Sequence, residues 1–108
     1  ERRGEMSHLS LDEMDVVIRE MSETELTEVM ERLKKEYPQK RVSLGHAITE
    51  KEEQNKRDDL LSDNIMFIKC MQELKDRYER QASEAWRKFY HEAEEFINKM
   101  LRNLSDRC

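Results

Sequence analysis

The sequence has few of the residues that end or bend secondary structure. Its 108 residues include two glycines and one proline, and aromatic residues make up 6%. Turns in β-proteins rely on glycine and proline, so this scarcity argues against a β-fold. The two cysteines, Cys70 and Cys108, are too few for a disulfide framework. We therefore expect a reducing intracellular location, in the cytoplasm or the nucleus.

The sequence also lacks features that mark several functional classes. No apolar run approaches the roughly 18 residues that cross a bilayer, and no signal peptide is present, so we expect no membrane span. The net charge is −5 and the basic residues are scattered among acids, which makes nucleic acid an unexpected partner. No glycine-rich phosphate loop occurs, and we expect neither a cofactor nor a small-molecule substrate. The chain begins at Glu1 rather than at Met, so we expect it to be part of a longer protein.

Charged residues and flexible apolar residues dominate what is present. Charged residues make up 42% and hydrophobic residues 36% of the chain. Glu, Lys, Arg, Met and Leu lose little side-chain freedom in a helix. The composition predicts an all-α fold of long, solvent-bathed helices.

Two helix starts are encoded by capping boxes. Ser10 and Glu13 can exchange side-chain-to-backbone hydrogen bonds, with Leu9 and Met14 as a hydrophobic staple. Ser22 and Glu25 repeat the device, with Met21 and Leu26 as the staple. The pattern predicts a short helix over about 11–20, a sharp corner, and a second helix that begins near Glu23.

The second predicted helix carries an apolar face that ends at Pro38. Its apolar residues are Leu26, Met30, Leu33 and Tyr37. A proline inside a helix removes a hydrogen bond and crowds the preceding turn, so we expect a kink or break at Pro38. Residues 49–59 contain no apolar side chain; they fit either an exposed helical spacer, which we favour, or a linker. The capping residues Ser62, Asp63 and Asn64 suggest a further corner.

The longest periodic stretch predicts a third helix over about 64–104. Apolar residues recur there with an 11-residue period, which keeps them on one face of a nearly straight helix. They are Phe67, Met71, Leu74, Tyr78, Ala82, Ala85, Phe89, Ala93, Phe96, Met100 and Leu104, and Trp86, Tyr90, Ile97 and Leu101 widen the face. This ridge is too large to face water, and we expect a second copy of the chain to cover it.

Residues able to carry chemistry are present but dispersed. His8, His46 and His91 lie in separate segments, and no histidine is placed near Cys70 to act as its base. In the run from His91 to Glu95, Glu95 stands where the zinc-protease helix has its second histidine. We therefore expect no catalytic site and no metal site, and we interpret Cys70 as a buried apolar residue.

Part of the sequence resembles the SARAH domain, the helical dimerisation module of Hippo-type kinases, Salvador and Ras-association adaptors. The resemblance spans residues 6–57, about half of the chain. It is carried by Met6, Leu9, Leu11, Met14, Tyr37, Lys40, Arg41, Leu44, Ala47, Ile48 and Lys51. It implies pairing with a like or related domain.

These observations predict one helical interaction domain. It comprises an N-terminal flank (1–8), a short helix plus a kinked helix (9–58) and a long amphipathic helix (59–108), arranged as a coiled-coil-like or helical-bundle homodimer. We expect a non-catalytic scaffold that binds itself and another helical protein. The predicted interface residues are Leu26, Met30, Leu33, Tyr37, Phe67, Met71, Leu74, Tyr78, Trp86, Phe89, Phe96 and Met100.

Two alternatives remain open at this point. One is a nucleic-acid-associated module that uses the basic patch of Lys34, Lys35, Lys40 and Arg41 around Tyr37. The other is a segment that folds only on a different helical partner.

Overall fold

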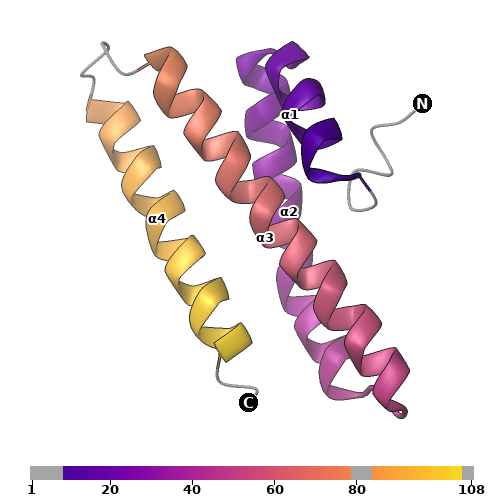
Figure 1. Cartoon of the computed structure of the whole chain (residues 1–108). Helices are drawn as coiled ribbons and strands as arrows, with labels where there is room; N and C mark the ends of the chain where they lie inside the picture. The colour runs from indigo at the N-terminus through magenta and orange to yellow at the C-terminus, as the bar shows by residue number, and fades with distance from the viewer. Residues whose placement is uncertain (1–8, 79–83, 106–108) are drawn as a thin grey trace.

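The structure, a computed structural model, consists of four helices over the residues it describes, 9–78 and 84–105. They are α1 (Leu11–Glu20), α2 (Glu23–Gly45), α3 (Glu50–Tyr78) and α4 (Glu84–Ser105). Helices α2 and α4 run in one direction and α3 runs in the other, while the short α1 lies beside the upper part of α2 and α3 (Figure 1). The prediction of an all-α fold is confirmed. The predicted N-terminal flank, 1–8, lies outside the described residues.

Both predicted capping boxes form. At the start of α1, the Ser10 amide donates to the Glu13 carboxylate at 2.9 Å, and the Glu13 amide donates to the Ser10 hydroxyl at 3.2 Å. Ser22 and Glu25 make the same pair of bonds at 2.9 and 3.1 Å. Each box satisfies amide groups that have no partner within the helix, which fixes the corner between α1 and α2.

Of the kink or break predicted at Pro38, the break does not occur. It continues through Pro38 to Gly45. A proline inside a helix costs about 3 kcal/mol, but Tyr37 and Leu44 on either side of it are buried. The burial of these two side chains offsets the cost, because each contributes about 1.5–3 kcal/mol when removed from water.

Helix α3 begins well before the predicted third helix. Residues 50–59 are helical, as we favoured for this stretch. A third cap precedes them: the Glu52 amide donates to the Thr49 hydroxyl at 3.0 Å. The predicted corner at Ser62, Asp63 and Asn64 is wrong, because all three residues lie inside α3.

The predicted helix over 64–104 is two helices. α3 ends at Tyr78 and α4 begins at Glu84, and residues 79–83 lie outside the described part of the chain. The two helices are antiparallel neighbours (Figure 1). An apolar stripe of constant period fits one straight helix, and it equally fits two antiparallel helices whose stripes face each other. The sequence pattern does not separate these two arrangements.

Three aromatic rings join the long helices. Phe96 of α4 lies 4.9 Å from Phe67 of α3 and 5.5 Å from Tyr37 of α2, measured between ring centroids, and it meets Tyr37 edge-on. Aromatic pairs with this spacing contribute about 0.5–1.5 kcal/mol each beyond their burial. These contacts hold α4 against both other helices.

Polar contacts fix α1 and the hairpin between α2 and α3. Lys69 of α3 binds Asp15 of α1 at 2.7 Å, and Arg77 donates to the carbonyls of Ile18 and Arg19 at 3.3 Å. Carbonyls at the end of a helix lack partners within it, so Arg77 caps α1. At the other end of the molecule, Lys56 donates to the Ser43 carbonyl at 3.1 Å and thereby secures the end of α2.

Candidate protein-binding surface

The predicted interface residues form the core of the single chain. Those that are buried are Leu26, Met30, Leu33, Tyr37, Phe67, Met71, Leu74 and Met100. Those that are half-buried and packed against this core are Tyr78, Trp86, Phe89 and Phe96. The chain therefore covers most of its apolar ridge itself. Only the parts of these side chains that reach the surface are available for contact between copies.

They reach the surface where α2 and α4 meet over α3. We call this line the α2–α4 seam. Three hollows follow it. We name them upper, central and lower, in order from the starts of both helices, which Figure 1 draws at the top, to their ends. Predicted interface residues that line the hollows are Met30, Tyr37, Phe67, Leu74, Tyr78, Trp86 and Phe89.

The upper hollow is mainly aromatic and carries one acid. It measures about 240 Å³ and is lined by Glu23, Thr27, Leu74, Tyr78, Trp86 and Phe89. The Trp86 ring lies 5.8 Å from that of Tyr78 and 5.5 Å from that of Phe89. A hydrogen bond from its own backbone amide and one from Tyr78 lower the pKa of Glu23. This hollow is therefore an apolar recess with a carboxylate at its edge.

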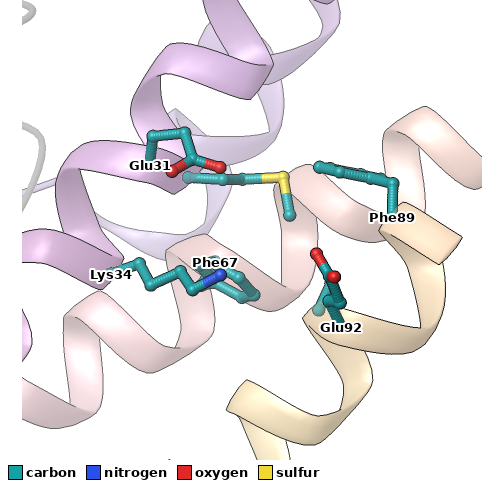
Figure 2. A pocket seen from close by; sticks show the side chains of 7 residues that line it. Glu31, Lys34, Phe67, Phe89 and Glu92 are labelled. Carbon is teal, nitrogen blue, oxygen red and sulfur yellow. The ribbon is translucent and has the colours of Figure 1, made fainter.

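The central hollow is small and has a charged rim. It measures about 20 Å³, which is room for about one water molecule. Figure 2 shows Glu31 and Lys34 on α2 and Glu92 on α4 around it, with the rings of Phe67 and Phe89 lining it. Charges of both signs therefore lie at the middle of the seam, above closely packed rings.

The lower hollow is basic and has the largest volume of the three. It measures about 440 Å³ and is lined by Tyr37, Pro38, Arg41 and Val42 of α2 and Lys99 of α4. Neither Arg41 nor Lys99 forms a salt bridge with any residue that the structure describes. Val42 is 60% exposed. Two cations and an exposed aliphatic side chain are thus available to a partner.

A buried polar group lies between α2 and α3, near this end of the seam. Lys40 binds Asp63 at 2.5 Å and Asp59 at 3.2 Å, and the Asp63 side chain is only 7% exposed. Burial raises the pKa of Asp63, although Lys40 acts against the shift. Burial lowers the pKa of Lys40, but Asp63 and Asp59 outweigh this effect and raise it. Lys40 is therefore paired with two acids, so the predicted basic patch carries less net positive charge than its sequence suggests.

The side chains considered for chemistry lie apart from one another. Cys70 is fully buried, and burial raises the pKa of its thiol to about 12. His91 lies 3.2 Å from Glu95 on the exposed side of α4. Within the described residues, no three His, Cys, Asp or Glu side chains lie close enough to share a metal ion. Of the described helices, none combines the length and apolar composition that a bilayer crossing requires.

No family model, curated protein or solved structure matches this chain. The resemblance to the SARAH domain therefore stays a prediction. So does the role of the predicted residues in contact between copies.

The seam also contains residues that the sequence analysis did not predict. They are Glu23, Thr27, Glu31, Pro38, Val42, Glu92 and Lys99. Apart from Val42, each is next to an apolar stripe residue in the sequence or lies three or four positions from one. A search for the residues that flank the apolar stripes could therefore have found these. The pairing of the α2 border with the α4 border depends on the fold of the chain.

Proposed function

We propose that this chain is a non-catalytic protein–protein interaction module that forms homodimers through the α2–α4 seam and serves as a scaffold in a larger assembly. The observation that carries the proposal is the row of three hollows along one helix junction, with aromatic walls in the upper hollow and at least one charged residue lining each hollow. Aromatic residues and arginine are enriched in protein interfaces. The resemblance to a dimerisation domain points to the same role.

Other exposed apolar side chains do not compete with the seam as an interface. Those above one-third exposure are Leu11, Val16, Val42, Ile48, Leu61 and Leu101, spread over all four helices and one connection. Single exposed aliphatic residues are ordinary on protein surfaces. Of these residues only Val42 lines a hollow of the seam.

Nucleic acid fits the seam less well than protein does. Lys40 is held by Asp63 and Asp59, and Glu31 and Glu92 lie beside Lys34 at the central hollow. A phosphate backbone needs a continuous basic surface, and these acids would repel it. Binding of an RNA or DNA oligonucleotide that weakens with salt would contradict this preference.

A pair of matched substitutions tests the proposed surface. Val42→Glu introduces a charge at the lower hollow, and Ile48→Glu introduces the same charge at an aliphatic side chain that is 89% exposed and lines none of the three hollows. In sedimentation velocity, we expect Val42→Glu to weaken dimer formation and Ile48→Glu to leave it unchanged. Circular dichroism checks that both variants keep the wild-type helix content. A wild-type chain that is monomeric throughout, or equal effects of the two variants, would overturn the proposal.

A further inference from the structure

The charges along the α2–α4 seam change sign from one end to the other. The upper hollow has Glu23 as its charged lining residue. Arg77 of α3 lies 3.9 Å from the Glu23 carboxylate, but it is held more closely by Glu73 at 2.8 Å, so this end keeps a net negative charge. The central hollow has Glu31, Lys34 and Glu92, and the lower hollow has Arg41 and Lys99. The seam is therefore acidic at the start of both helices, mixed in the middle and basic toward their ends.

The two ends lie at matching distances from the central hollow. Along α2, Glu23 and Arg41 are five helical turns apart, about 27 Å at 1.5 Å per residue, and their midpoint falls between Glu31 and Lys34. Along α4, the midpoint between Trp86 and Lys99 falls at residues 92 and 93, which line the central hollow. A rotation of half a turn about the central hollow therefore exchanges the upper and lower hollows on both helices.

We infer that a second copy of the chain binds this seam across a two-fold axis through the central hollow, with the acidic end of each copy on the basic end of the other. The inference rests on the proposed function and adds the direction and register of the pair. It places Glu23 of one copy near Arg41 and Lys99 of its partner. It also places the exposed Val42 against the partner's upper hollow, whose walls are Trp86 and Phe89.

The opposite direction of pairing brings like charges together. If the two seams ran the same way, the two acidic ends would lie together, and Arg41 would face Lys99 of the partner. Like charges placed against each other across an interface disfavour that arrangement. Both directions give a closed two-fold pair, because each copy uses the same surface. The charges therefore decide in favour of the reversed arrangement.

Charge reversal in two separate chains tests this direction. We expect Glu23→Lys alone, and Arg41→Glu with Lys99→Glu in another chain, each to weaken self-association about tenfold. An equimolar mixture of the two variants should regain the wild-type affinity, because reversed charges then face each other at one end and unchanged opposite charges face each other at the other end. Sedimentation velocity gives the affinities, and circular dichroism confirms folding.

Matched controls and a second pair keep the test decisive. Glu28→Lys and Lys51→Glu reverse exposed charges that line none of the hollows, and mixing them should change nothing. Because Glu23 lies in the first turn of α2, where a negative charge stabilises the helix, Glu31→Lys mixed with Lys34→Glu repeats the test near the axis. A mixture no tighter than either variant alone would overturn the arrangement, as would Glu23→Lys binding wild type more tightly than wild type binds itself. Wild type that does not self-associate would overturn the proposed function instead.

Discussion

The aromatic contact of Phe96 gives a sharp prediction about how α4 is held. Phe96→Leu keeps most of the apolar area of this half-buried side chain but removes its ring contacts with Phe67 and Tyr37. Each such pair contributes about 0.5–1.5 kcal/mol. We therefore expect the free energy of unfolding to fall by about 1–3 kcal/mol in urea titrations followed by circular dichroism.

Phe89→Leu is the matched control for this prediction. It is the same substitution on the same helix, but the contact of the Phe89 ring is with Trp86, at 5.5 Å. We expect about half the loss that Phe96→Leu causes. A loss for Phe96→Leu no larger than that for Phe89→Leu would refute the reasoning.

Protein concentration separates contacts within one chain from contacts between chains. If Phe96 packs within its own chain, the loss should persist in dilute samples where the chain is monomeric. If the rings instead met between two copies, dilution would unfold the helices and remove the difference between variant and wild type. A chain that loses its helix content on dilution would contradict the internal core.

Two further predictions concern buried groups. Cys70, whose thiol is fully buried and has its pKa raised to about 12, should react with a thiol reagent only as fast as the chain unfolds, so labelling at the rate of an exposed thiol at that position would contradict its burial. Asp63 binds its proton at a higher pH in the folded chain than in the unfolded chain, because its folded pKa is raised. Its contribution to the free energy of unfolding therefore grows as the pH falls through that raised pKa and is lost as the pH rises again. Relative to Asp63→Asn, the wild type should gain stability between about pH 7 and about pH 4 in urea titrations, and a constant or falling difference would contradict the shift.

Local capping patterns allowed the helix starts to be predicted from sequence. The boxes at Ser10 and Ser22 form as expected, because each depends on residues three positions apart. The same Ser/Thr-x-x-Glu spacing occurs at Thr49 and Glu52, and it marks the start of α3. This start signal was not predicted, because the residues that follow it carry no apolar stripe. Start signals of this kind are local, so the sequence contains them in full.

The arrangement of the helices in space was harder to predict. The apolar period beyond Phe67 predicted the faces of α3 and α4 but not the reversal between them, because both arrangements bury the same stripe. Asp63 and Asn64 looked like turn residues, yet both are buried inside α3, where Lys40 of α2 binds Asp63. That partner lies on a different helix, so no local pattern reveals it.

The candidate surface was predictable only in part. The aromatic residues of the seam belong to the predicted stripes, but no sequence pattern places Lys99 beside Arg41. Their neighbourhood results from the packing of α4 against α2, which depends on the reversal after α3. The charge order along the seam could therefore be recognised only once the helices were in place.

The most direct measurement compares backbone amide chemical shifts of the isotope-labelled chain between dilute and concentrated samples. Self-association through the α2–α4 seam predicts concentration-dependent shifts along residues 23–42 of α2 and 86–99 of α4. The amides of α1 should stay unchanged. Spectra that do not depend on concentration, or shifts concentrated on α1 and the opposite side of α3, would contradict the account.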